Sequence, residues 1–194
     1  MKKLVLVVLA VFVASAAFAG NWGLGLKLGY GQNDPKTMKD LFDAYGGTLD
    51  ENGGVFAIEG QYEWDLQGAN KLGLRFGLDF YGNNELTQGS TTTENTIALP
   101  LTVYYRWDGG VKAFSYYAGG GITYIETEME APGLERSESK WFPHVLAGAE
   151  YRFSELFALG IEAKYNISAE VKKEGATYSD RSGVVGVLVG RFYF

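Results

Sequence analysis

Cysteine is absent from this 194-residue sequence, which excludes a small disulfide scaffold, thiol chemistry and any cysteine-ligated metal. Histidine occurs once, as His144, so neither a histidine-rich zinc site nor a choice of catalytic histidines exists. Beyond the first 20 residues, no apolar run approaches the ~20 residues that a membrane-spanning helix needs. These absences argue against most metal-dependent enzymes and against a helical membrane protein.

The N-terminus has the pattern of a secretory signal peptide. Two lysines precede the apolar run Leu4–Val13, and the small residues Ala17 and Ala19 form an A-x-A cleavage site before Gly20. A membrane anchor is the alternative, but the apolar run is short for a transmembrane helix and a cleavage site follows it. We therefore predict a signal peptide at residues 1–19 and one exported domain at residues 20–194.

The exported part is acidic. Without the two signal lysines, 15 basic and 23 acidic residues remain, a net charge of −8. This charge argues against nucleic acid as a partner, because phosphate backbones bind basic surfaces.

Eight segments of about ten residues alternate between apolar and polar side chains, which is typical of β-strands. Each is long enough to cross a bilayer at a tilt. The last segment runs to the final residue, and pairing it with the first would close a barrel without exposed edges. The segments are Trp22–Gly31, Val55–Asp65, Lys71–Tyr81, Thr96–Trp107, Val111–Ile125, Trp141–Phe153, Phe157–Ile167 and Gly183–Phe194.

Charge separates the two faces of these strands. The apolar faces carry no charged residue, and aromatic residues gather at both of their ends, as in the interfacial girdles of a lipid-facing wall. A soluble barrel would instead turn its apolar face to a cavity, and it would dissolve without detergent. The opposite faces are predicted to form a lumen charge network of Lys27, Glu59, Glu63, Arg75, Asp79, Arg106, Glu150, Arg152, Glu162, Lys164 and Arg191.

The connections alternate between long and short. The long ones, 32–54, 82–95, 126–140 and 168–182, are predicted to be external loops, and the short ones periplasmic turns. Both termini then lie on the periplasmic side, which requires an even number of strands. The predicted fold is an all-β, transmembrane, eight-stranded antiparallel up-and-down β-barrel.

Three segments resemble the small eight-stranded bacterial outer-membrane barrels: Ala98–Arg106, Ala147–Phe153 and Gly190–Phe194. That group includes the transmembrane domain of outer membrane protein A, the opacity-type adhesins and the porin-like barrel proteins. The resemblance implies an outer-membrane location among outer-membrane lipid. It also implies that the last strand, through Leu188, Phe192 and Phe194, forms the signal read by the barrel-assembly machinery.

Three local features carry separate expectations. Pro100 lies inside a predicted strand of a closed barrel, so a β-bulge is expected there. The segment from Asp34 to Gly47 has the cap, proline and apolar spacing of a short helix. Glu126, Glu128 and Glu130 alternate along one side of a strand extension, where a divalent cation is possible but a solvated strand is favoured.

His144 is the one histidine around which a catalytic site could form. Small lipid A deacylase barrels place a serine two positions after their histidine, and here that position is Leu146. An ordinary residue near the rim is therefore expected, with no catalytic, cofactor-binding or metal residues.

Two functions remain open at this point. The first is a structural or porin-like barrel, whose paired lumen charges either fill a closed core or line a narrow solute pathway. The second is a surface adhesin or receptor that binds an extracellular ligand through its long loops. An enzyme ranks last, for want of a catalytic constellation.

Overall fold

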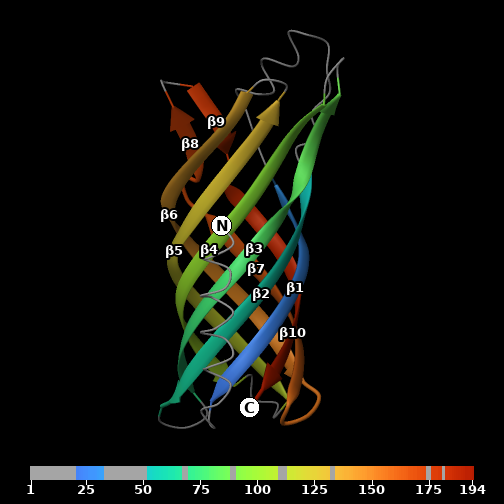
Figure 1. Cartoon of the computed structure of the whole chain (residues 1–194). Helices are drawn as coiled ribbons and strands as arrows, with labels where there is room; N and C mark the ends of the chain where they lie inside the picture. Colours follow the sequence, from blue (N-terminus) through green and yellow to red (C-terminus); the bar gives the residue numbers. More distant parts are fainter. Residues whose placement is uncertain are drawn as a thin grey trace.

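The computed structural model describes residues 21–32, 52–66, 70–87, 91–108, 113–131, 134–173, 176–180 and 182–194. Eight strands form a closed barrel, and two more form a separate hairpin (Figure 1). The barrel strands are β1 (Trp22–Gln32), β2 (Asn52–Asp65), β3 (Lys71–Thr87), β4 (Thr91–Asp108), β5 (Phe114–Ala131), β6 (Leu134–Arg152), β7 (Phe157–Asn166) and β10 (Gly183–Tyr193). The hairpin consists of β8 (Glu170–Lys173) and β9 (Ala176–Asp180).

The barrel closes by pairing its first strand with its last. The antiparallel register of β1 and β10 runs from Gly23 opposite Tyr193 to Gly31 opposite Val185. The backbone N–H of Phe194 also donates to the carbonyl of Trp22, at 2.9 Å. Every other pair of neighbouring barrel strands is also antiparallel, and the strands follow one another in chain order, with β10 next to β7. The predicted eight-stranded up-and-down barrel is therefore confirmed.

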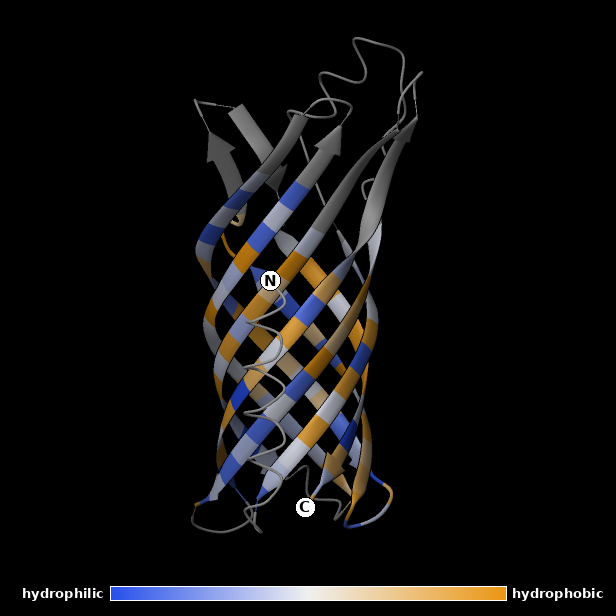
Figure 2. Ribbon diagram, in the orientation of Figure 1, coloured by the Kyte–Doolittle hydropathy of each residue, from blue (hydrophilic) through white to orange (hydrophobic). Residues whose placement is uncertain are grey.

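The outer face is apolar along the middle of the barrel. Leu28, Ile161 and Leu188 are each at least 60% exposed, and apolar residues alternate with polar ones along each strand (Figure 2). Water would not tolerate so much exposed aliphatic surface on a monomer, whereas lipid favours it. Among the described residues, no helix is long and apolar enough to cross a membrane.

Aromatic rings form the predicted girdle most densely near the short turns and the C-terminus, which we call the turn end. Here the rings of Trp22, Tyr62 and Trp64 contact one another in series, with centroids 4.9 and 4.8 Å apart. At the opposite end, which we call the hairpin end, the ring centroids of Tyr124 and Trp141 lie 5.1 Å apart. Such rings anchor a barrel at the two membrane interfaces.

The strands at the hairpin end are longer than predicted. Segments 82–95 and 126–140, predicted to be loops, belong largely to the β3–β4 and β5–β6 hairpins, and segment 168–182 contains the β8–β9 hairpin. The strand extension predicted from Glu126, Glu128 and Glu130 is confirmed, because β5 runs to Ala131. The fifth strand also begins later, at Phe114 rather than Val111. Above the membrane both faces of a strand meet water, so the apolar–polar alternation that marks a strand disappears there while the pairing continues.

The bulge expected at Pro100 is not present. The β3–β4 register is the same on both sides of this residue, with Phe76 opposite Leu101 and Asp79 opposite Ala98, and it shifts only between Tyr81 and Asn84. Gly77 faces Pro100 across the ladder, and a Cβ on Gly77 would lie 3.1 Å from the proline ring. The missing side chain of Gly77 gives the ring its space, so the strand stays regular.

The predicted signal peptide (residues 1–19), its predicted cleavage site and the helix expected at 34–47 lie outside the described residues.

Candidate functional site in the barrel interior

Arg191 lies at the centre of the lumen charge network and joins carboxylates from three strands. Its guanidinium donates to Glu59 and Glu150 at 2.8 Å each, and to Glu162 at 3.3 Å. The side chain is 1% exposed. A buried charge is stable only when its partners satisfy its hydrogen bonds, and this arrangement satisfies all three nitrogens of the guanidinium.

Two further cations share the same carboxylates. Lys27 lies 2.6 Å from both Glu59 and Glu162, and Arg75 pairs with Glu162 and lies 3.4 Å from Glu59. The guanidinium of Arg75 also lies 4.5 Å from the ring centroid of Tyr104 and 4.9 Å from that of Tyr117. The carboxylates neutralise both cations, and the two tyrosine rings also hold the guanidinium of Arg75 in place.

A second group of pairs lies nearer the turn end. Arg106 bridges Glu150 at 2.8 Å and Glu63 at 2.9 Å, and it also donates to the hydroxyl of Tyr193. Tyr193 in turn donates to Glu150, while Tyr104 donates to Glu63 at 2.8 Å. Glu150 therefore joins this group to Arg191, and the two groups form one continuous network.

Arg152 alone among the eleven predicted residues has no ion pair among the described residues. It is partly exposed at the last position of β6, where the lumen opens at the turn end, and its guanidinium lies 4.2 Å from the ring centroid of Tyr193. Without it the lumen network contains five basic and five acidic residues. Every member is buried: Lys27, Arg75, Arg106, Lys164, Arg191, Glu59, Glu63, Asp79, Glu150 and Glu162.

Toward the hairpin end the interior holds one further ion pair and a hydrogen-bonded histidine. Lys164 pairs with Asp79, and His144 is held between two threonine hydroxyls, those of Thr102 and Thr123, at 2.8 Å each. The rim position expected for His144 is therefore wrong, because the side chain is 1% exposed inside the barrel.

We expect Thr102→Val to lower the free energy of unfolding by about 1–3 kcal/mol, because it leaves a buried ring nitrogen of His144 without its partner. Urea unfolding of the refolded barrel, followed by gel mobility, measures this loss. In a His144→Leu background the same substitution is expected to cost much less. Equal costs in both backgrounds would show that the hydrogen bond contributes nothing.

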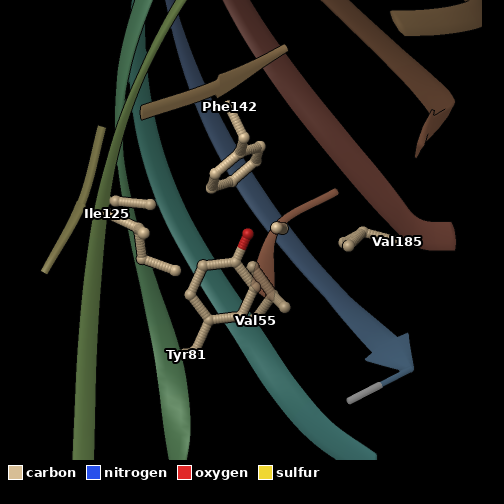
Figure 3. Close-up of a cluster of buried hydrophobic side chains, with 7 residues drawn as sticks. Val55, Tyr81, Ile125, Phe142 and Val185 are labelled. Atoms are coloured by element: carbon tan, nitrogen blue, oxygen red, sulfur yellow. The ribbon is translucent and has the colours of Figure 1, made fainter. Parts of the chain in front are cut away.

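An apolar layer closes the interior above His144, and we call it the apolar cap. It is formed by buried side chains that converge inside the barrel (Figure 3): Val55, Tyr81, Ala98, Ile125, Phe142, Ala169 and Val185. The inward face is therefore charged in the middle of the barrel and apolar at the hairpin end. Strand β10 turns Val185, Val187 and Val189 inward before it reaches Arg191.

Little space remains between these layers. A cavity between the charge network and Thr102 has room for about one water molecule. An ion that entered would have to displace paired charges, which is costly in a buried site. Paired side chains therefore occupy the space around this cavity.

Inward-facing glycines give the large interior side chains their space, and our sequence reasoning missed them. A Cβ on Gly73 would lie 2.1 Å from the ring of Tyr104, and one on Gly148 would lie 2.3 Å from the ring of Tyr117. The same alternation that assigned Arg106 and Arg191 to the lumen also assigns Tyr104 and Tyr193 to it. The tyrosines were therefore detectable from the sequence, whereas the glycine contacts required the register.

Metal binding was the alternative considered for the acidic side chains. No group of three or more histidine, aspartate or glutamate side chains among the described residues is placed to hold a metal ion. Glu126, one of the three acids considered for a cation, instead accepts a hydrogen bond from Ser137 at 3.2 Å.

Comparison with known proteins identifies the fold. The sequence matches the family described as "Outer membrane protein beta-barrel domain" over residues 4–190. The solved Neisserial surface protein A is 12% identical, with a TM-score of 0.62 over 90% of this chain and 98% of that one. The attachment invasion locus protein Ail of Yersinia pestis is 17% identical (TM-score 0.55, 90% and 99% covered), and OprG of Pseudomonas aeruginosa 11% (0.54, 89% and 95%). No curated protein matches the sequence.

Proposed function

Because the chain belongs to the outer membrane protein beta-barrel domain family, we propose that it is a structural outer-membrane barrel with a closed interior. Its location is the outer membrane. We propose that the hairpin end faces outward and the short turns face the periplasm, as in other barrels of this membrane. The observation that supports a closed interior is the balanced network of five buried acids and five buried bases beneath an apolar cap. Such a barrel holds its external hairpins at the cell surface without passing solutes.

The hydrogen bonds and ion pairs inside the barrel also disfavour catalysis. The single histidine is buried and hydrogen-bonded to Thr102 and Thr123, and neither a serine nor an acid is among these partners to complete a triad. The carboxylates are committed to arginine and lysine partners rather than open to a substrate. We therefore propose a protein without enzymatic activity.

A liposome-swelling assay tests the closed interior. Liposomes that contain the refolded chain are expected to swell no faster in small sugars or amino acids than empty liposomes do. A general porin serves as the positive control for swelling. Solute-dependent swelling by a chain that also shows the gel shift of a folded barrel would contradict the closed interior.

Assembly is the second part of the proposal. Leu188, Phe192 and Phe194 are 60%, 45% and 60% exposed on the outer face of the closing strand or just after it. We propose that lipid contacts them in the folded barrel and that the assembly machinery reads them beforehand. The test is the amount of folded protein in outer membranes after Phe194→Ala, with refolding in detergent as the control that the variant still folds.

A receptor or adhesin role is the second candidate, and the tall hairpins favour it. Strand β5 continues to Ala131, beyond the aromatic pair of Tyr124 and Trp141, and β6 returns from Leu134. One similar solved structure is that of Ail from Yersinia pestis in complex with the heparin analogue sucrose octasulfate. Here β5 carries Glu126 and Glu128, so a cationic partner suits this hairpin better than an anionic polymer.

Shortening the β5–β6 hairpin discriminates between the two roles. If the chain acts through this hairpin, replacing residues 126–140 by a two-residue turn removes binding to host cells or matrix while the barrel still folds. The matched control shortens the β3–β4 hairpin by residues 84–94. Unchanged binding in the first variant would exclude this hairpin as the binding surface.

A further inference from the structure

The apolar cap contains one residue that does not belong to the barrel wall. Six of its members lie on barrel strands, but Ala169 lies in the connection between β7 and β8. It is 0% exposed, although the preceding Ser168 is exposed. The chain therefore leaves β7, turns at Ser168 and enters the mouth of the barrel at Ala169.

The turn at Ser168 is sterically unfavourable for a residue with a side chain. Its φ is 52°, in the left-handed region, which is uncommon for residues other than glycine, asparagine and aspartate. Such a conformation persists only where the surroundings enforce it, and it then points to a role for the segment.

Three hydrogen bonds enforce this conformation. The N–H of Ile167 donates to the carbonyl of Pro143, and the ammonium of Lys140 donates to the carbonyl of Ser168, at 2.9 Å each. The N–H of Ala169 donates to the hydroxyl of Ser182 at 2.8 Å. Ala169 directly precedes the β8–β9 hairpin and Ser182 follows it, so the last bond ties the two ends of the hairpin together.

We propose that this corner is a latch: Lys140 and Ser182 hold Ala169 in the apolar cap, and displacement of the β8–β9 hairpin withdraws it and opens the extracellular mouth. The opening reaches the level of His144 and Leu146, where Lys164 lies opposite Leu146 and the charge network begins. The inference goes beyond the proposed function. The two claims are tested by different measurements: the rate of thiol labelling tests the latch, whereas solute passage and ion current test the closed interior.

The absence of cysteine allows a direct test. Leu146→Cys places a unique thiol beneath the cap, at a position that is 6% exposed and borders the internal cavity. The rate at which a charged methanethiosulfonate reagent labels this thiol, in the chain refolded into nanodiscs, measures how often the mouth opens. Folding of every variant is checked by heat-dependent gel mobility.

The latch predicts faster labelling when its hydrogen bonds are removed. Each lost bond shifts an equilibrium by about two- to tenfold, so Lys140→Ala and Ser182→Ala together are expected to raise the rate about tenfold or more. Ser137→Ala is the matched control, because it removes a hydroxyl hydrogen bond from the same strand at the outer surface. Equal rates in the double variant and the control would overturn the proposal.

Two variants at Ser168 test the same corner without removing Lys140 or Ser182, and they serve if the double variant does not fold. Ser168→Gly accepts a positive φ and is expected to label as slowly as the starting chain, whereas Ser168→Val resists it and is expected to label faster. Equal labelling of the glycine and valine variants would show that the corner does not control access to the interior.

Discussion

Arg191→Ala is expected to lower the free energy of unfolding of the barrel by about 3–5 kcal/mol, enough to prevent refolding under mild conditions. The substitution removes a guanidinium that contacts Glu59, Glu150 and Glu162, each of which is at most 4% exposed. Lys27 and Arg106 still neutralise part of the remaining charge. The interior nevertheless holds one uncompensated buried negative charge in place of a balanced set.

Arg152→Ala is the matched control for this prediction. Arg152 was predicted from the same alternation to belong to the same network, but it is partly exposed and its described contact is with the ring of Tyr193. A loss below about 1 kcal/mol is therefore expected. Urea unfolding of both variants gives the comparison, and similar losses in the two would show that burial and ion pairing at Arg191 do not determine stability.

Gly73→Ala is expected to cost about 1–3 kcal/mol of unfolding free energy, through overpacking of a filled interior. The added methyl would lie 2.1 Å from the ring of Tyr104, which is 1% exposed and cannot move away without breaking its bond to Glu63. Gly186→Ala is the control, since nothing lies within 4 Å of a Cβ at that position. It is expected to be nearly neutral.

A double-mutant cycle shows whether the ring of Tyr104 is the cause. In a Tyr104→Ala background the methyl at position 73 has space, so most of the penalty of Gly73→Ala is expected to disappear. An unchanged penalty in that background would place the effect in the backbone of β3 rather than in the contact with the tyrosine.

The transmembrane part of the fold was predictable because lipid imposes a strict alternation on every strand. The eight segments were found, and ten of the eleven predicted lumen residues lie buried in ion pairs. Arg152 differs because alternation predicts which face of the sheet a residue lies on, but not its position along the barrel axis. That position decides whether a side chain lies inside the lumen or at its mouth.

The remaining differences have the same physical origin. Outside the membrane the alternation fades, so the β8–β9 hairpin and the extensions of β3, β4 and β6 left no signal in the sequence. The extension of β5 is the exception, because its acids Glu126, Glu128 and Glu130 still alternate. The apolar cap depends on inward residues of six strands meeting at one level, which only the register determines. Accommodation of Pro100 likewise depends on Gly77 lying opposite it.

The current through the refolded chain in a planar lipid bilayer tests the closed interior most directly. The paired charges and the apolar cap predict a folded barrel that stays silent under applied voltage, and they predict that it stays silent after the control change Arg152→Ala. Steady, reproducible openings of the unmodified chain, altered by Arg106→Ala or Glu150→Ala, would contradict the account. Those residues would then line a pathway rather than fill a core.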